Sequence, residues 1–485
     1  MSEPEWWRDA VVYQIYPRSF QDSDGDGTGD LQGIRSRLDH IVTLGADALW
    51  LSPIYPSPMA DGGYDVADYA GVDPMFGDLA QFDLLVGAAH ARGLKVLMDI
   101  VPCHTSIEHP WFTERPDWYV WSDRDGPRNN WRATFGGPAW SRDPHGRGWY
   151  LHSFYPEQPD LNWRNPEVRE AMAGVLRFWR ERGVDGFRLD AIDRLLKDPE
   201  MRDDPVATVP PPLPEANEEY AGLQHVHSRN APDIGIALAA LREGAGDAFL
   251  VGEVYLPSAE LAPYLEHLEV AFSFELFHAS WDATAVPAAV AAAVGLDVAW
   301  VLSNHDFPRL PDRVGEVNAR AAAMLALTLP GPVFVYQGDE IAMAGGADGT
   351  PPDDRAGRDP FRTPMCWDAD APHGGFSDAT PWLPAACPPG GGVAQQDAEP
   401  TSALHLYRDL VALRRSLGPG LELVDAADGV IAFRRGDDHL VALNLSSEER
   451  PAPAAGAVVR HTHGATGQAP QTLSGGEGFV ATLRG

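Results

Sequence analysis

The chain has 485 residues, 44% hydrophobic and 22% charged, so it is long enough for a large buried core and unlike a disordered chain. Its 37 basic and 70 acidic residues give a formal net charge of −33, which disfavours nucleic acid and anionic membrane surfaces as partners. The charge is compatible with a neutral or cationic substrate, although solubility alone is the simpler explanation.

Cysteines are scarce and scattered. Cys103, Cys366 and Cys387 form no CxxC pair, and so small and odd a number is typical of a reducing compartment. The N-terminus lacks the pattern of a signal peptide, and the apolar runs are too short or too interrupted to cross a bilayer. We therefore expect a cytoplasmic protein with no membrane partner and leave its oligomeric state open.

Short β-branched segments alternate with segments of helical periodicity. Strands are predicted at residues 11–17, 48–53, 95–102, 186–192, 249–254, 270–276, 299–306 and 333–339. Helices are predicted between them, among them residues 30–45, 78–93, 166–183 and 402–417. Eight strand–helix units whose strands are apolar on both faces predict an α/β fold, a closed (β/α)8 TIM barrel rather than an open doubly wound sheet.

Two insertions and a C-terminal change of pattern define the predicted domains. The barrel is expected at residues 1–103 and 166–418, interrupted by a small subdomain at 104–165 that is rich in Trp, Gly, Pro and Asn. Residues 198–232 are Pro-rich and acidic, which predicts a long loop that serves as a lid or is disordered. Alternating apolar residues at 419–485 predict an antiparallel β domain resembling a sandwich.

The carboxyl ends of the predicted strands carry the candidate catalytic residues, because reactive groups in this architecture lie on that face. These ends give Asp190, Glu253 and Asp306, together with His104 and His305. One Asp at a strand end is more often a helix cap or an ion-pair partner, but three carboxylates from three strands are harder to explain in that way. A carboxylate pair about 5–5.5 Å apart performs retaining glycosidic cleavage, one member as nucleophile and the other as acid/base.

Neighbouring residues predict how the two carboxyl groups are tuned. Arg188 precedes Asp190 by two residues and is expected on the same strand face, where its guanidinium would orient Asp190 and keep it ionised. Glu253 lies between Gly252 and Val254, surroundings that favour the raised pKa of an acid catalyst.

Six motifs stand out: GFRLD at 186–190, VGE at 251–253, SNHD at 303–306, QPDLN at 158–162, RD at 358–359 and RTPM at 362–365. They resemble those of glycoside hydrolase family 13, the α-amylase family, and within it the oligo-1,6-glucosidase and α-glucosidase group. The resemblance implies a retaining, exo-acting α-glucosidase acting on short oligosaccharides through a covalent glucosyl-Asp190 intermediate. Glu253 would be the acid/base, and Asp306 would stabilise the transition state.

The same resemblance implies roles for further residues around the glucose. The implied substrate-binding residues, besides Arg188, are Asp61, Tyr64, His104, Phe135, His305 and Arg362. Tyr64 would stack on the glucose, Asp61 and Arg362 would bind its distant hydroxyls, and the two histidines would bind hydroxyls near the cleaved bond. Core packing is the alternative for Tyr64 and Phe135.

Two positions depart from the family pattern. Cys103 replaces the usual Asn that ligates an interdomain calcium in amylases, and a neutral thiol is a poor ligand for a hard cation, so we expect no calcium there. Ala191 follows the nucleophile where α-1,6-acting members often have Val, which favours α-1,4 substrates and leaves α-1,6 linkages and sucrose open.

Residues 22–30 (DSDGDGTGD) have oxygen-bearing side chains at alternate positions, like the first half of an EF-hand loop. The twelfth position is Gly33 rather than Glu, so a true EF-hand is excluded. The resemblance implies one structural calcium, and no organic cofactor. Its implied ligands are Asp22, Asp24, Asp26, Asp30 and the Thr28 carbonyl; an acidic turn that caps the next helix is the alternative.

Two other functions remain open from the sequence. An α-glucosyl transferase or isomerase, such as a trehalose synthase, would share every catalytic residue and differ in how well its pocket excludes water. A non-catalytic relative would be expected to lose part of the carboxylate triad, which this chain keeps.

Overall fold

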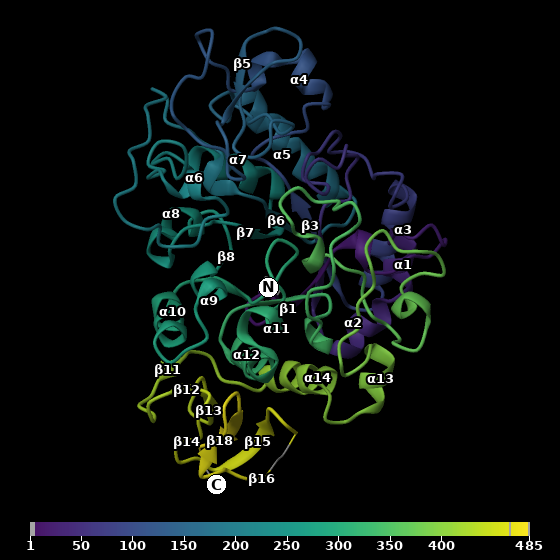
Figure 1. Cartoon of the computed structure of the whole chain (residues 1–485), viewed down its shortest axis with the longest axis vertical. Coiled ribbons are helices and arrows are strands. Elements are labelled where there is room, and N and C mark those ends of the chain that lie inside the picture. Colours follow the sequence, from purple (N-terminus) through teal and green to yellow (C-terminus); the bar gives the residue numbers. More distant parts are fainter. Residues whose placement is uncertain (1–4, 465–466, 484–485) are drawn as a thin grey trace. The chain divides into compact units, whose positions relative to one another are not determined.

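The computed structural model describes residues 5–464 and 467–483 (Figure 1). Eight parallel strands form a closed barrel in the order β1-β10-β9-β8-β7-β6-β3-β2, which confirms the predicted fold class. The barrel strands are β1 (Val11–Ile15), β2 (Ala48–Leu51), β3 (Lys95–Ile100), β6 (Gly186–Leu189), β7 (Phe249–Gly252), β8 (Val270–Phe272), β9 (Val298–Val301) and β10 (Val333–Tyr336).

Every barrel strand ends earlier than the sequence predicts. Asp190 and Glu253 are the first residues after β6 and β7, and Asp306 lies five residues beyond the end of β9. The predicted strands are too long because buried apolar side chains continue beyond the last hydrogen-bonded residue of a strand. Ile192 and Leu302, for example, are buried although neither belongs to a strand.

The chain divides into two compact units. The first unit comprises Met1–Trp50, Gly87–Leu94 and Glu275–Gly485, and the second comprises Leu51–Val86 and Lys95–Phe274. In the first unit β10 pairs with β1 and β9; in the second, β3, β6, β7 and β8 pair in sequence. The predicted domain boundaries stay a prediction.

The helices of the first unit include one correction. The single helix predicted at 30–45 is two helices, α1 (Leu31–Ser36) and α2 (Leu38–Leu44), because Arg37 leaves the helical conformation with φ −107° and ψ 7°. The other helices of this unit are α10 (Ala285–Ala293), α11 (Leu310–Val314), α12 (Glu316–Thr328), α13 (Val393–Ala398) and α14 (Ala403–Arg414).

In the second unit, α5 (Pro166–Glu181) shows how the sequence builds a barrel helix. The Asn165 side chain caps its first turn, and a stripe of apolar residues that ends at Trp179 is buried. This helix packs against α7 (Gly235–Ala245), where a Cβ at Gly244 would lie 2.6 Å from the Ala173 backbone. Only glycine permits so close an approach of the two helices.

The two insertions of the second unit are both structured. Residues 104–165 contain α4 (Pro110–Glu114) and the paired strands β4 (Trp140–Arg142) and β5 (Trp149–Leu151). The loop at 198–232 contains α6 (Glu218–Ala221) and a β-bridge between Val206 and Leu223, so the disordered alternative is wrong. Further short helices of the chain are α3 (Leu79–His90), α8 (Ala262–Leu265) and α9 (Phe274–His278).

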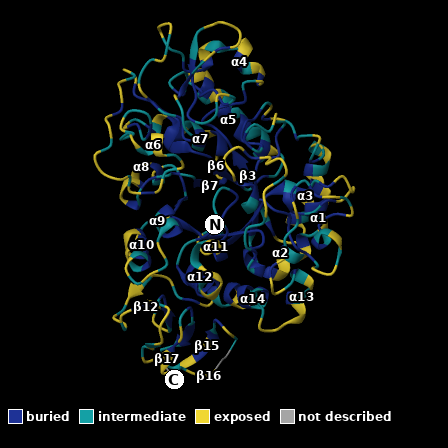
Figure 2. Ribbon diagram, in the orientation of Figure 1, coloured by how far each residue is buried: buried dark blue, intermediate teal, exposed yellow. Residues whose placement is uncertain are grey.

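The C-terminal part of the first unit confirms the predicted antiparallel sheet, which is yellow in Figure 1. Its order is β11-β12-β13-β18-β15-β16, and β13 packs against α12. These strands are β11 (Glu422–Leu423), β12 (Val430–Arg435), β13 (His439–Asn444), β15 (Ala457–His461), β16 (Gly467–Gln468) and β18 (Gly478–Thr482), with β14 (Arg450–Pro451) and β17 (Thr472–Leu473) forming a separate pair. Figure 2 shows that the barrel strands β3, β6 and β7 of the second unit are buried.

The cysteines correct the sequence-based expectation. Cys366 and Cys387 form a disulfide across 21 residues, and Cys103 is free and buried. The pairing was missed because 20 residues of irregular Gly- and Pro-rich chain separate the two, and only the fold brings their Cα atoms to 5.3 Å. A cytoplasmic location stays a prediction, and the disulfide removes the argument for it that rested on reduced cysteines. Among the described residues, no helix is long and apolar enough to cross a membrane.

Candidate active site

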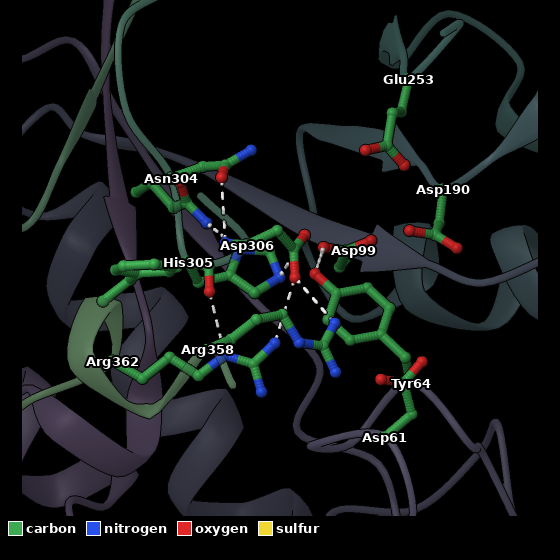
Figure 3. Close-up of polar contacts among 12 residues, drawn as sticks. Asp61, Tyr64, Asp99, Asp190, Glu253, Asn304, His305, Asp306, Arg358 and Arg362 are labelled. Carbon is green, nitrogen blue, oxygen red and sulfur yellow. Dashed lines mark hydrogen bonds and ion pairs between the residues drawn. The ribbon is translucent and has the colours of Figure 1, made fainter. Parts of the chain in front are cut away.

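In the second unit one buried guanidinium holds three carboxyl groups. Arg188 Nη1 donates to Asp99 Oδ1 at 2.8 Å and to Asp190 Oδ1 at 2.7 Å, and Nη2 pairs with Glu253 Oε2 at 2.9 Å. Asp99 lies opposite Arg188 in the β3–β6 register. The expected contact between Arg188 and Asp190 is therefore present, and the same side chain also holds the acid/base candidate. Figure 3 shows Asp190 and Glu253 side by side.

The charges in this group are unbalanced, with three acids around one base. Burial raises the pKa of Asp190; Arg188 opposes this rise, whereas the charges of Glu253 and Asp99 and a hydrogen bond to Glu253 add to it. Burial likewise raises the pKa of Asp99 to about 6, against the lowering effects of Arg188 and Tyr64. The expectation that Arg188 keeps Asp190 ionised is therefore only partly met: Arg188 lowers the pKa of Asp190, but burial and the other two carboxyl groups outweigh it. Asp190 and Glu253 therefore interact with each other as well as with Arg188.

The residue after Asp190 has an uncommon backbone conformation. Ala191 has φ 45° and ψ 42°, in the left-handed region, and its N–H donates to Glu253 Oε2 at 3.1 Å. A non-glycine residue pays on the order of 1 kcal/mol for this conformation. The strained turn thus supplies a donor that fixes the Glu253 carboxyl group.

A buried polar network surrounds the candidate glucose-binding residues of this unit. Tyr64 donates from its hydroxyl to Asp99 Oδ2 at 2.9 Å. Gln158 Nε2 donates to Asp61 Oδ2 at 2.9 Å and lies 2.9 Å from His104 Nε2. The structure therefore brings Asp61 and His104 together through Gln158, a residue of the QPDLN motif that was not selected as a site residue.

Phe135 lies in an aromatic cluster. Its ring stacks on Tyr155 with centroids 4.5 Å apart and lies 5.9 Å from Phe154, which in turn lies edge-on to His104 at 5.1 Å. Phe135 is only half-buried, so a fully internal core role is excluded for it.

Cys103, His104 and Asp160 have ligand atoms close enough to one another to hold a metal ion. Asp160 already forms an ion pair with an ammonium group, because Lys197 Nζ lies 2.9 Å from Asp160 Oδ2. The same ammonium group donates to Ser153 Oγ at 3.0 Å and to the Arg194 carbonyl. Burial raises the pKa of the Cys103 thiol, which donates to the Arg194 carbonyl. A neutral thiol and a nearby fixed positive charge do not fit a divalent cation.

In the first unit, Asp306 receives two guanidinium groups. Arg358 Nη1 and Arg362 Nη2 each donate to Asp306 Oδ1 at 3.0 Å (Figure 3). His305 Nε2 lies 3.2 Å from Asp306 Oδ2, and the Asp306 N–H donates to Asn304 Oδ1 at 2.9 Å. These charge-assisted hydrogen bonds hold the carboxyl group in one orientation.

A second layer of contacts supports these groups. Arg358 forms a two-pronged pair with Asp354, with contacts of 3.0 and 2.6 Å, and Arg362 Nε donates to the His305 carbonyl at 2.9 Å. Gln14 Nε2 lies 2.9 Å from His305 Nδ1. His305 is fully buried, and its position is fixed from both ring nitrogens.

The predicted calcium loop is ordered by its own carboxylates. Asp22 accepts from the N–H groups of Asp24, Gly25 and Gly27 and from Ser377 Oγ, at 2.5–3.0 Å. Burial raises the pKa of Asp22, but these hydrogen bonds outweigh it, so the pKa lies below its ordinary value. Asp30 caps α1 through Gly33 N, as the alternative interpretation expects.

Oxygens of Asp22, Asp24 and Asp30 lie within 4.8 Å of one another. Three hard anionic oxygens so close together fit a calcium ion. Asp26 is outside this group and accepts from the Thr28 N–H at 2.7 Å.

Sequence reasoning missed four residues with direct contacts to the candidate site. Gln158 and Arg358 lie inside motifs quoted above and Asp99 lies in the strand predicted at 95–102, so their positions were an available signal. Lys197 had none, because only the folded chain brings it to Asp160.

Comparison with known proteins places these residues in a family. Residues 14–418 match the family described as "Alpha amylase, catalytic domain". A "Probable alpha-glucosidase" from Rhizobium meliloti (strain 1021) is 42% identical, covering 92% of this chain and 90% of that protein. A "Probable oligo-1,6-glucosidase 3" from Bacillus subtilis (strain 168) is 34% identical, covering 91% of each.

A solved structure is also similar over nearly the whole chain. The α-glucosyl transfer enzyme XgtA has a TM-score of 0.91 and 37% identity, covering 99% of this chain and all of that one. The family match begins within β1 and spans the other seven barrel strands and the motifs described above. The chain therefore belongs to the α-amylase family, glycoside hydrolase family 13, and is a glycoside hydrolase.

Proposed function

We propose that the enzyme is a retaining, exo-acting α-glucosidase that removes terminal α-linked glucose from short oligosaccharides, with α-1,4 linkages preferred. The observation that carries the proposal is the Asp190–Glu253 pair, in which both carboxyl groups contact the guanidinium of Arg188. Two adjacent carboxyl groups suit double displacement, which needs one ionised and one protonated member.

The mechanism follows from these positions. Ionised Asp190 attacks the anomeric carbon, while the Glu253 carboxyl group gives its proton to the glycosidic oxygen, so that the leaving alcohol departs and a glucosyl-Asp190 ester forms. Glu253, now ionised, takes a proton from water, and the resulting hydroxide displaces Asp190 with overall retention. Arg188 and the Ala191 N–H keep the two carboxyl groups oriented through both steps.

The remaining candidate residues are assigned to transition-state stabilisation and glucose binding. Asp306, negatively charged and held by two arginines, is proposed to stabilise the oxocarbenium-like transition state. The proposed glucose-binding residues are Asp61, Tyr64, His104, Phe135, His305 and Arg362. Support comes from the fold, in which residues that follow the carboxyl ends of barrel strands build the active site.

Hydrolysis is favoured over glucosyl transfer or isomerisation. The two curated relatives described above are named as glucosidases, whereas the structural neighbour is named for glucosyl transfer. Adding a glucosyl acceptor and searching for longer or isomerised products separates the two functions.

The test is time-resolved NMR of products from maltose, isomaltose, sucrose and trehalose, with Asp190→Asn as the inactive control. Release of α-glucose from maltose as the first product, absent in the control, is the expected result. First release of β-glucose would refute retention, and conversion of maltose to another disaccharide would refute hydrolysis.

A structural calcium is proposed in the loop of residues 22–30, with Asp22, Asp24, Asp26, Asp30 and the Thr28 carbonyl as ligands. The closeness of three of these carboxylates supports it. Metal analysis of the purified protein and melting with calcium or with EGTA test it. We expect about one calcium per chain and a lower melting temperature in EGTA, and Asp24→Asn should remove most of that difference.

A further inference from the structure

An aromatic side chain at the carboxyl end of β1 has no role in the sites described above. Tyr16 directly follows β1, and residues in that position build the active site in barrels of this kind. Its N–H donates to Gln337 Oε1 at 2.9 Å, and its carbonyl accepts from the Ser19 N–H at 2.9 Å. The side chain is 3% exposed. Hydrogen bonds to both backbone groups therefore fix where this buried ring lies.

The Tyr16 ring contacts two residues that are proposed to bind glucose. It stacks on the His305 imidazole, with centroids 5.7 Å apart and an angle of 22° between the planes. Arg362 Cζ lies over the same ring, 5.4 Å from its centroid, a distance at which the aromatic face attracts a guanidinium group. His305 and Arg362 are also neighbours of each other, since Arg362 Nε donates to the His305 carbonyl (Figure 3). Tyr16 therefore supports both of them.

Polar contacts alone leave both groups room to tilt. Gln14 and Asp306 contact the His305 ring at its two nitrogens, which lie in the plane of the ring. Asp306 and the His305 carbonyl likewise contact Arg362 at nitrogens in the plane of its guanidinium group. Contacts at the edge of a flat group resist sliding in its plane more than tilting out of it. A ring packed against the flat face resists that tilt, because packed atoms leave little free space.

The aromatic face of Tyr16, rather than its hydroxyl group, makes these contacts. Within residues 5–464 and 467–483, no hydrogen bond joins the Tyr16 hydroxyl to another residue. Phenylalanine at this position therefore keeps the stacking and the cation–π contact, whereas leucine loses both.

We propose that Tyr16 is a positioning residue whose ring holds His305 and Arg362 in the orientations that bind glucose. The proposal rests on the proposed α-glucosidase function, in which His305 and Arg362 contact the sugar and Tyr16 acts through them. Glucose binding, rather than the chemical step, then depends on the ring.

The test measures kcat and KM of Tyr16 variants on whichever of the four disaccharides named above is hydrolysed best. Tyr16→Phe should keep KM within about twofold of the wild-type value. Tyr16→Leu should raise KM about tenfold, or about 1.4 kcal/mol, because a stacked pair and a cation–π contact are lost together. Asp306 keeps its contact with Arg358, so kcat should fall less than about threefold. The inhibition constant of glucose should rise in parallel with KM.

A folding defect has a different kinetic signature. It lowers the fraction of active enzyme, so that the apparent kcat falls while KM is unchanged. Phe20→Leu is the matched control, because Phe20 is buried in the same unit and lies edge-on to Tyr13 and Trp367 at 6.1 and 5.1 Å. This variant should lower the melting temperature and leave KM unchanged.

A second variant keeps the shape of the ring for the case in which Tyr16→Leu does not fold. Pentafluorophenylalanine in place of Tyr16 fills nearly the same space, but its fluorine atoms withdraw the negative charge from the ring face that attracts Arg362. Its KM should exceed that of Tyr16→Phe about threefold.

Equal KM values for Tyr16→Phe and Tyr16→Leu overturn the proposal. If both are normal the ring has no role, and if both are raised the hydroxyl group causes the effect. A loss in kcat alone also overturns it, and the pentafluorophenylalanine variant replaces Tyr16→Leu in this comparison if the latter does not fold. A wild-type enzyme that hydrolyses none of the disaccharides overturns the α-glucosidase function itself, and the role of Tyr16 with it.

Discussion

Replacing Lys197 by Met tests the buried ion pair beside His104. Lys197 and Asp160 are 5% and 0% exposed, and their charged atoms lie 2.9 Å apart. Removing one partner of a buried pair costs about 3–5 kcal/mol, because the other charge is left without compensation. Asp160 also accepts two hydrogen bonds from Ser153, so we expect the lower end of this range, about 3 kcal/mol at neutral pH.

The direction in which the stability loss of the Lys197→Met variant changes with pH follows from the pKa of Asp160. In the wild type, burial raises the pKa of Asp160, but the effects of Lys197 and Ser153 are larger, so the pKa lies below its ordinary value. The stability that Asp160 contributes is therefore lost only as pH falls. Without Lys197 only the hydrogen bonds from Ser153 oppose the burial effect, and we expect the pKa of Asp160 to rise above its ordinary value. The variant should then lose stability as pH increases, and its deficit should be larger at pH 8 than at pH 5.

The assay is urea unfolding followed by tryptophan fluorescence at the two pH values. Lys95→Met is the matched control, since its pair with Asp185 is 37% exposed on the lysine side and should contribute at most about 1 kcal/mol. The double variant Lys197→Met/Asp160→Asn removes both charges and should recover at least about 1 kcal/mol. A loss no larger than that of the control, or no recovery in the double variant, would refute the reasoning.

Three further predictions concern other parts of the structure. Asp339 is buried and its pKa is raised to about 6, so the folded state loses roughly 2–3 kcal/mol of stability as pH rises from about 4 to 6. This loss should be absent in Asp339→Asn, whose urea midpoint should depend less on pH than that of the wild type. Arg358→Lys keeps the charge but loses the two-pronged contact, so kcat should fall about tenfold as Asp306 loses its orientation, while an unchanged kcat would exclude a positioning role. Gly244→Ala places a methyl group 2.6 Å from the Ala173 backbone and should cost about 1–3 kcal/mol, and a melting temperature equal to that of the wild type would contradict the close helix packing.

The sequence predicts what depends on local pattern. The strand ending at Leu189 and the buried stripe of α5 follow from the pattern of apolar side chains, and Asp190 and Glu253 follow from their positions after such strands. The features that sequence reasoning does not predict depend on contacts between residues far apart in the chain. The pairing of Arg188 with Asp99 spans 89 residues, the Lys197–Asp160 pair lies between an insertion and a loop, and no periodicity marks either of them. The raised pKa values of Asp190 and Asp99, which burial causes, and the ammonium group of Lys197 beside Asp160 could be read only from the folded chain.

The backbone of Ala191 has an evolutionary consequence. In its left-handed conformation a β-branched side chain collides with neighbouring backbone atoms, whereas alanine tolerates it at modest cost. Replacing Ala191 by valine therefore carries a folding penalty, whatever its effect on substrate. Lineages that acquire the valine should first accumulate stabilising substitutions elsewhere, so that the order of mutations along such a path is constrained by stability rather than by catalysis.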